Sequence, residues 1–289
     1  MSEHPEIHRT AVIGCGTMGS GIAEVLAKAG LDVLVLVSSQ PSELAGRTRL
    51  EVSLDRAVRK KKLTEPDRLA ILDRIEFTTD FAALADRQFV IEAIGEDDAA
   101  KTALFTDLTK VLRDPDAILA STTSAIPIVR LARVTDRPGN VVGLHFFNPA
   151  PVLPLVEVIA SVLTEDPTVA RVEHFATRVL GKQVVNSPDR SGFVVNALLF
   201  PYLLSAIRMV SDGTATPETV DRAMVQGCAH PMGPLALADM IGLDTTVAIA
   251  NAMYEEFKEP LYAAPPLLSR MVEGGLLGRK SGRGFYEYR

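Results

Sequence analysis

A histidine and a glutamate stand where apolar strands are expected, and their types suit proton transfer. His145 ends the apolar run 141–145, and Glu157 lies inside the apolar run 153–159. A positioned imidazole can serve as a general acid or base near neutral pH. A carboxylate in an apolar strand needs a partner or a proton. A His–Glu pair would meet that need and orient the imidazole. The alternative is a core histidine with a structural ion-pair partner.

Two further polar side chains stand where they can hold a reacting oxygen. Ser124 follows the apolar run 117–120, and Asn196 lies within the apolar run 193–210. Each can donate a hydrogen bond to a substrate oxygen near His145. The alternatives are a serine that caps a helix and an asparagine that bonds a neighbouring helix.

A glycine-rich turn follows the first strand-like run. Gly14, Gly16 and Gly19 form a G-x-G-x-x-G pattern that includes Thr17 and Met18, and an Ala-rich helical pattern follows it. The three glycines permit the turn, the close approach of a pyrophosphate and the packing of the helix on the sheet. The helix N-terminus adds unpaired N–H groups and partial positive charge. The turn predicts a dinucleotide site; an empty βα turn and an S-adenosylmethionine site are the alternatives.

The elements that must position these residues alternate in type. Strand-like runs cover 10–13, 33–37, 89–94, 117–120, 141–145, 153–159 and 183–185, with helical patterns at 20–29, 43–62, 99–112 and 168–180. This alternation predicts an α/β fold with a Rossmann-type doubly wound, mostly parallel sheet and helices on both faces. Only helical patterns follow, at 193–210, 217–227, 235–257 and 266–273. We therefore expect an α/β domain at 1–188 and a smaller all-α domain at 189–289.

Composition narrows the class of protein. The 289 residues are 47% hydrophobic and carry a formal net charge of −6, which argues against nucleic acid as a partner. The two cysteines cannot build a disulfide framework and fit a reducing compartment. The polar start has no signal-peptide core, and polar residues interrupt the longest apolar run. We expect a cytoplasmic protein with no membrane span and no metal site.

Five segments carry motifs that are specific in combination. They are Gly143-Leu144-His145-Phe146-Phe147-Asn148-Pro149, Leu155-Val156-Glu157-Val158-Ile159, Ser191-Gly192-Phe193-Val194-Val195-Asn196, Pro231-Met232-Gly233-Pro234 and the closing run 277–288. In these segments the chain resembles the 3-hydroxyacyl-CoA dehydrogenase family, in its short single-function 3-hydroxybutyryl-CoA dehydrogenase form. The resemblance covers essentially the whole chain. It implies the interconversion of (S)-3-hydroxyacyl-CoA and 3-oxoacyl-CoA by hydride transfer to or from a nicotinamide cofactor.

The resemblance also implies roles for the candidate residues. His145 would exchange the proton of the 3-oxygen, and Glu157 would stabilise the charged imidazole. Ser124 and Asn196 would hold the reacting oxygen and the thioester carbonyl. The α/β domain would bind the dinucleotide, and the helical domain would bind substrate and form a homodimer. We expect Leu235, Leu237, Ile241 and Leu243 to present apolar surface in that domain.

Further contacts implied by the resemblance concern the cofactor and coenzyme A. Glu96 and Lys101 are expected near the nicotinamide ribose, and Asn148 in the cofactor site beside the histidine. Ser53 and Lys60 belong to a segment rich in basic residues and are expected to contact the acyl-CoA substrate. The alternative for the charged residues among them is a solvated surface position.

The end of the second strand departs from the usual NAD-binding pattern. An acid is usual there, about 20 residues past the glycines, where it binds the ribose 2′-OH. In this chain the position is Val37, followed by Ser38 and Ser39, and no carboxylate comes before Glu43. The serines can hydrogen-bond a 2′-phosphate, and Arg47 can approach it. We expect NAD or NADP, with a preference for NADP; the alternative is that NAD binds with serine in place of the acid.

Two other functions stay open. One is a related dehydrogenase that acts on a free hydroxy acid or sugar acid, and the other is a non-catalytic nucleotide-binding protein. The complete set of Ser124, His145, Glu157 and Asn196 argues against the non-catalytic reading. The basic segment favours a CoA ester over a free acid.

Overall fold

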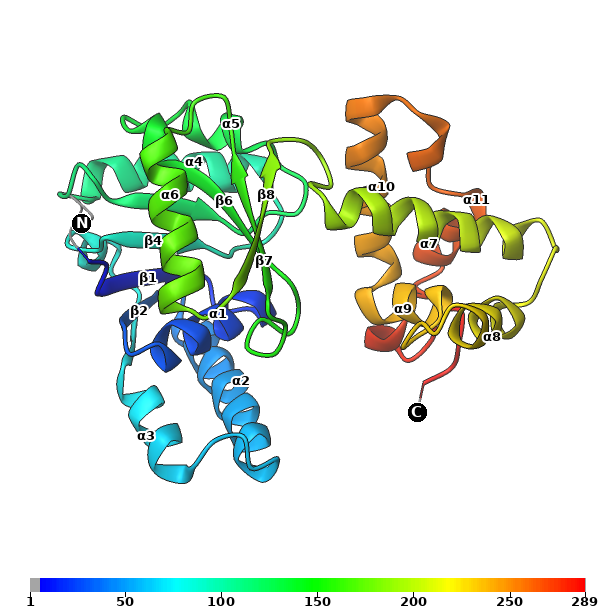
Figure 1. The fold of residues 1–289 in the computed structure, drawn as a ribbon, viewed down its shortest axis with the longest axis horizontal. Coiled ribbons are helices and arrows are strands. Elements are labelled where there is room, and N and C mark those ends of the chain that lie inside the picture. Colours follow the sequence, from blue (N-terminus) through cyan, green and yellow to red (C-terminus); the bar gives the residue numbers. More distant parts are fainter. Residues whose placement is uncertain (1–5, 289) are drawn as a thin grey trace. The chain divides into compact units, whose positions relative to one another are not determined.

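The computed structural model describes residues 6–288, and the chain divides into two compact units, Met1–Asp189 and Arg190–Arg289 (Figure 1). The first unit holds the strands β1 Arg9–Ile13, β2 Asp32–Leu36, β3 Ile75–Thr78, β4 Phe89–Glu92, β5 Ile118–Ser121, β6 Val141–Phe146, β7 Leu155–Ala160 and β8 Gln183–Pro188. Its helices are α1 Thr17–Lys28, α2 Gln40–Arg59, α3 Glu65–Asp73, α4 Asp98–Val111, α5 Ile128–Ala132 and α6 Asp166–His174.

The strands form one sheet of eight in the order β3-β2-β1-β4-β5-β6-β7-β8. Neighbouring strands are parallel except β6 and β7, which are antiparallel. This arrangement confirms the predicted doubly wound, mostly parallel sheet. The strand order reverses between β1 and β4, so the loops that follow these two strands mark the place where open α/β sheets bind ligands.

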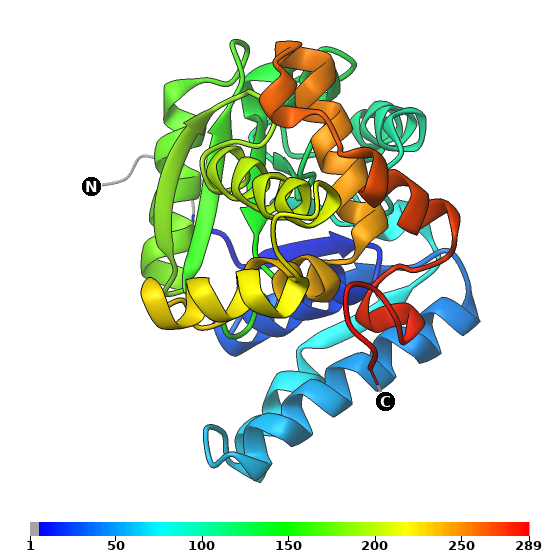
Figure 2. The same ribbon diagram turned by 90° about the vertical axis from the view of Figure 1, so that its right-hand side faces the viewer.

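Helices cover both faces of this sheet. Ile22 and Leu26 of α1 share a buried core with Val172 of α6 and with Val12 and Val35 of the sheet. Helix α4 lies on the opposite face from α6, as Figures 1 and 2 show from two directions. Both faces are apolar because a parallel sheet is buried on both sides, which explains its nearly continuous apolar strands.

Helices α2 and α3 form a hairpin that projects from the sheet in both views (Figures 1 and 2). The Ser39 side chain caps α2, and Thr64 forms a capping box with Asp67 at the start of α3. These caps satisfy N–H groups that the helices leave unpaired. The hairpin begins just after β2, and the basic segment around Lys60 lies at its tip, where α2 ends.

Several short elements of the first unit were not predicted from the sequence. Strand β3 is an edge strand of four residues with only Ile75 buried, and α5 has five residues. Helix α3 was also unexpected. The helix expected over 168–180 is instead α6 followed by a π-helical turn, Phe175–Val179. Such short stretches carry too few residues for a hydrophobic period to be visible.

The second unit contains the helices α7 Val195–Ser211, α8 Pro217–Gly227, α9 Pro234–Ile241, α10 Leu243–Phe257 and α11 Pro266–Glu273, with no named strand among residues 190–288. Its core includes Leu204, Leu235, Leu243 and Leu268. The expectation that Leu235 and Leu243 present apolar surface is therefore wrong, because both are fully buried. No single described helix is long and apolar enough to span a membrane; α9 and α10 meet that test only as a pair, with a bend of 95° between them.

Two buried aspartates hold the closing segment of the chain against these helices. Asp239 accepts hydrogen bonds from the backbone N–H groups of Phe285 and Tyr286, both at 3.0 Å, and from the Tyr288 hydroxyl at 2.9 Å. Asp221 accepts from the Tyr286 hydroxyl at 2.9 Å. The closing motif therefore has a structural basis within this unit.

Candidate active site

His145 and Glu157 form a buried pair on the antiparallel strands β6 and β7. The two residues are direct register partners, and Nδ1 lies 2.7 Å from Oε2. The histidine is 4% exposed and the glutamate 0%. The Phe147 ring packs edge-on against the imidazole at 4.8 Å. Because a carboxylate only accepts, Nδ1 carries the hydrogen of this bond, and Nε2 is left to exchange a proton.

Ser124 lies against the other nitrogen of the imidazole. Its Oγ is 3.0 Å from Nε2 of His145. The serine belongs to the turn after β5, at the carboxyl edge of the sheet. The structure thus brings together Ser124, His145 and Glu157, three of the four residues that the sequence predicted as catalytic.

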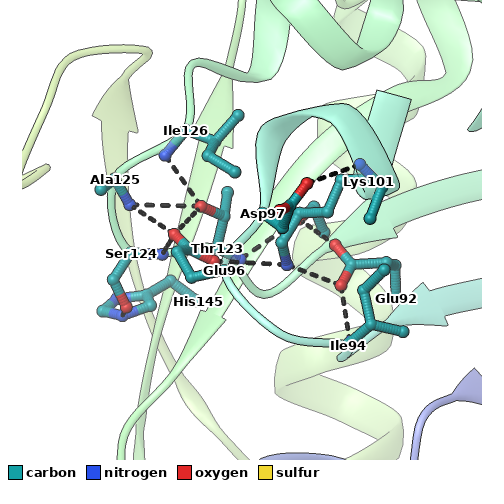
Figure 3. Close-up of polar contacts among 12 residues, drawn as sticks. Glu92, Ile94, Glu96, Asp97, Lys101, Thr123, Ser124, Ala125, Ile126 and His145 are labelled. Atoms are coloured by element: carbon teal, nitrogen blue, oxygen red, sulfur yellow. Dashed lines mark hydrogen bonds and ion pairs between the residues drawn. The ribbon is translucent and has the colours of Figure 1, made fainter. Parts of the chain in front are cut away.

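Glu96 accepts several hydrogen bonds from the turn that carries Ser124 (Figure 3). Glu96 Oε1 accepts from the backbone N–H groups of Ser124 at 3.1 Å and Ala125 at 3.2 Å, and from the Thr123 hydroxyl. Thr123 Oγ1 in turn accepts from the N–H of Ile126 at 2.8 Å. These bonds fix the backbone from which the serine hydroxyl projects.

Lys101 is not a solvated surface charge. It is 1% exposed, and its Nζ lies 2.6 Å from Oε1 of Glu92 and 3.3 Å from Oε2 of Glu96. Glu92 is fully buried and was missed in the sequence, although the signal was present: like Glu157, it is a carboxylate in an apolar strand. The charged groups after β4 therefore form a connected network beside the serine turn.

The glycine-rich turn fits an anionic dinucleotide. A Cβ on Gly14, whose φ is +91°, would meet the Ala93 oxygen at 2.8 Å, and one on Gly19 would meet the Gly14 oxygen at 2.0 Å. Gly16 faces open space, caps α1 without a side chain, and the first turn of α1 carries no acid. Exposed Thr17 and half-buried Met18 begin that helix. The turn thus leaves room for a phosphate at the start of α1, and the first turn of that helix carries no acid that would repel it.

The edge of β2 carries no free acid. Val37 is buried in the core and Ser38 is exposed, while Ser39 Oγ accepts from the N–H of Ser42 at 3.4 Å. Glu43 is paired with Arg47 at 2.8 Å. The Arg47 guanidinium lies over the Phe77 ring at 4.4 Å from its centre.

A cavity of about 510 Å³ lies between α1, α2 and the loop after β6. Thr17, Ser53, Arg56 and Asn148 are among its lining residues. The structure therefore brings Ser53 and Asn148 to one space next to the glycine-rich turn. Lys60 is exposed at the end of α2 and does not line this cavity.

Asn196 belongs to the second unit, in the first turn of α7, where it is 7% exposed. Its contact with substrate stays a prediction. Among residues 6–288, no group of three or more His, Cys, Asp or Glu side chains is arranged to hold a metal ion.

The doubly wound sheet with its glycine-rich turn, and the His–Glu pair beside a serine, define a dinucleotide-dependent oxidoreductase that moves a proton at an oxygen atom. Two domain families match the chain: the NAD-binding domain of 3-hydroxyacyl-CoA dehydrogenase over residues 9–190, and its C-terminal domain over 192–288. The chain belongs to the 3-hydroxyacyl-CoA dehydrogenase family.

Its relatives include proteins that match over nearly their whole length. A 3-hydroxybutyryl-CoA dehydrogenase of Mycobacterium tuberculosis is 58% identical over 98% of this chain and 99% of the relative. The crystal structure of M. tuberculosis FadB2 matches with a TM-score of 0.97 at 58% identity, over 99% of this chain and 100% of that one. The (S)-3-hydroxybutyryl-CoA dehydrogenase PaaH1 of Ralstonia eutropha matches with a TM-score of 0.93 at 42% identity, over 98% and 100%.

Proposed function

We propose that this chain interconverts (S)-3-hydroxyacyl-CoA and 3-oxoacyl-CoA, with 3-hydroxybutyryl-CoA as its substrate. The carrying observation is the hydrogen-bonded series Ser124, His145 and Glu157, with spacings of 3.0 and 2.7 Å. This series can exchange a proton at a hydroxyl or carbonyl oxygen. The printed names of the relatives supply the class of substrate.

The residues of the chain account for the proton side of this reaction. A bound nicotinamide supplies the chemistry of hydride transfer with C3 of the substrate. In oxidation, Nε2 of His145 accepts the proton of the 3-hydroxyl, and Glu157 stabilises the resulting imidazolium. In reduction, the protonated imidazole donates to the oxygen. Ser124 is proposed to hydrogen-bond that oxygen. Asn196 is proposed to hydrogen-bond either the same oxygen or the thioester carbonyl.

The test is the absorbance of reduced nicotinamide in the presence of acetoacetyl-CoA. Consumption of the reduced cofactor supports the proposal. His145→Gln is the matched variant, because it keeps a polar side chain but cannot act as an acid or base. We expect its kcat to fall by about 10²–10⁴. Activity on acetoacetate but not on its CoA ester would instead favour the free-acid alternative, and cofactor binding without turnover the non-catalytic one.

For the cofactor, we propose that the N–H groups around Gly14, Gly16, Thr17, Met18 and Gly19 bind the pyrophosphate. The accessible, uncapped start of α1 supports this assignment. Glu96, Lys101 and Asn148 are assigned to the nicotinamide half by resemblance. Because the Lys101 ammonium is buried against Glu92 and Glu96, this lysine would act on the cofactor only through these two carboxylates.

We propose that NADP(H) is preferred over NAD(H). Ser38 is exposed just after β2, the next carboxylate is paired with Arg47, and α2 begins two residues later at Gln40. An acid there would repel a 2′-phosphate, whereas hydroxyl and N–H groups can bind one. The ratio of kcat/KM for NADPH and NADH measures this preference.

Coenzyme A is proposed to contact α2. Ser53 lines the cavity beside the glycine-rich turn, and Lys60 lies exposed beyond it at the end of the same helix. A thioester whose reacting end reaches His145 would extend its phosphates along this basic segment. Lys60→Ala should raise KM for acetoacetyl-CoA without changing kcat.

We also propose a cytoplasmic homodimer that assembles through the helical domain. Leu198 is 74% and Met209 44% exposed on α7, an apolar surface that a second copy would cover. The exposed thiol of Cys228 fits a reducing compartment. Light scattering that gives only the monomer mass would exclude the dimer, and Leu198→Glu should dissociate it.

A further inference from the structure

We propose that Glu92 is a positioning residue for the catalytic serine: it anchors Lys101 and, through Lys101 and Glu96, holds the turn that carries Ser124. The kinetic consequence rests on the proposed function, whereas the consequence for the backbone does not. Figure 3 shows the contacts that lead from Glu92 through Lys101 and Glu96 to the turn of Ser124, with His145 beside that turn.

Glu92 is a fully buried carboxylate whose two oxygens both accept hydrogen bonds. Oε1 accepts from Nζ of Lys101 at 2.6 Å and from the N–H of Ile94 at 2.7 Å, and Oε2 accepts from the Ser121 hydroxyl at 2.5 Å. Glu92 and Ser121 are register partners at the ends of β4 and β5. Glu92 therefore lies where two loops begin: the loop after β4, which contains Glu96, and the loop after β5, which contains Ser124.

Lys101 needs this carboxylate because its ammonium has lost contact with water. Its side chain is 1% exposed, and a buried charge without a partner is costly. Of its two anionic neighbours, Glu92 is the closer, at 2.6 Å against 3.3 Å for Glu96. Glu92 therefore carries most of the neutralisation, and Glu96 is only partly engaged by the cation.

Because Glu92 neutralises most of the Lys101 charge, Glu96 can also bind the backbone of the serine turn. Its Oε2 faces Lys101, while its Oε1 accepts from the backbone of Ser124 and Ala125. Its side chain is 42% exposed and so less confined than Glu92. If Glu92 lost its charge, the buried ammonium would draw Glu96 closer, and the bonds from Oε1 to the serine turn would lengthen. Ser124 would then leave its position 3.0 Å from Nε2 of His145.

The decisive variant is Glu92→Gln, which keeps the shape but removes the charge. At saturating cofactor we expect kcat with acetoacetyl-CoA to fall by about 10–100-fold, the effect of a small misplacement of a reacting group, with KM for the thioester nearly unchanged. Independently of turnover, the peptide that spans 122–128 should exchange its amide hydrogens faster than in the unaltered protein. Glu92→Asp restores the charge and should recover part of kcat and of the protection.

Lys101→Met and the double variant Glu92→Gln/Lys101→Met show whether Glu92 acts through Lys101. With Lys101 replaced, the Glu92 charge has no cation to neutralise, so the double variant should be no slower than Lys101→Met alone. Residues of one network give such non-additive effects, whereas independent residues add. If the loss of activity in the double variant equals the sum of the losses in the two single variants, expressed as free energies, the proposal is overturned.

Thr10→Val is the matched control for a merely structural effect. Thr10 is 0% exposed in the same sheet, and its hydroxyl donates to the backbone carbonyl oxygen of Asp32 at 2.9 Å, at the opposite end of the strands. We expect it to lower the melting temperature while kcat and the exchange of 122–128 stay unchanged. If Glu92→Gln behaves like Thr10→Val, Glu92 is structural only. If the unaltered protein does not reduce acetoacetyl-CoA, the proposed function fails, and exchange of 122–128 still decides the positioning role.

Discussion

His145 and Glu157 face each other across β6 and β7, and Nδ1 lies 2.7 Å from Oε2. Directly opposite residues of an antiparallel pair project to the same face of the sheet, so the register itself makes this contact. It is the one antiparallel pairing between named strands of the described sheet. The reversal of direction at β7 thus places a buried carboxylate directly behind the imidazole that is proposed to exchange the proton.

Replacing Glu157 by glutamine should impair catalysis without dismantling the pair. The amide oxygen can still accept from Nδ1, but the protonated imidazole loses the charge that stabilises it. We expect kcat to fall by about tenfold or more, with the larger effect in oxidation, where the imidazole gains its proton. Steady-state rates in both directions test this, with circular dichroism as the control for folding. Equal rates for Glu157→Gln and the unaltered protein would contradict the assigned role.

Introducing an acid at the end of β2 should change the cofactor preference. Ser38 is exposed there, so Ser38→Asp places a carboxylate at the edge where a 2′-phosphate is proposed to bind, without burying it. We expect kcat/KM for NADPH to fall about tenfold or more relative to that for NADH, the equivalent of about 1.4 kcal/mol. Ser38→Asn is the uncharged control. A proportional loss with both cofactors would mean that this edge does not contact the 2′ position.

The pairing of His145 with Glu157 and the architecture of the sheet were predictable because both leave local signs. A polar residue in an apolar run marks a buried group that needs a partner, and the alternation of runs marks a βα repeat. The burial of Leu235 and Leu243 left no such sign, because an apolar helical face looks alike whether it meets its own core or a second chain.

The network around Lys101 was not predictable from the same reasoning. A lysine in the first turns of a polar-faced helix usually lies in water, and here it turns inward because Glu92 ends the adjacent strand. That contact depends on how β4 and α4 are joined, which the spacing of residues does not fix. Glu96 was expected near the cofactor, but its bonds to the serine turn depend on the parallel register of β4 and β5.

The two cysteines should differ sharply in reactivity. Burial raises the pKa of the Cys15 thiol to about 11, against the opposing effect of Arg49 and Arg47, whereas Cys228 is exposed. Because the thiolate is the reactive form, a disulfide reagent at pH 8 should modify one thiol rapidly in the native protein and a second only after unfolding. Cys228→Ser should remove the fast phase. A fast phase that persists in this variant would show that Cys15 is accessible.

Alkaline pH should loosen the closing segment through Tyr288. Burial, and then its hydrogen bond to Asp239, raise the pKa of this phenol to about 12 from an ordinary value of 10. Above pH 10 the unfolded chain releases the phenolic proton while the folded protein retains it. The stabilisation by this group is therefore complete below pH 10 and is lost as the pH rises to about 12.

Melting temperatures between pH 9 and 12 test this prediction, with Tyr288→Phe as the comparison. The variant should melt below the unaltered protein at pH 9, because Asp239 loses a donor, and the difference should shrink as the pH approaches 12. The titration of Cys15 is common to both proteins and cancels in the difference. A difference that stays constant over this range would mean that the phenol does not donate to Asp239 in solution.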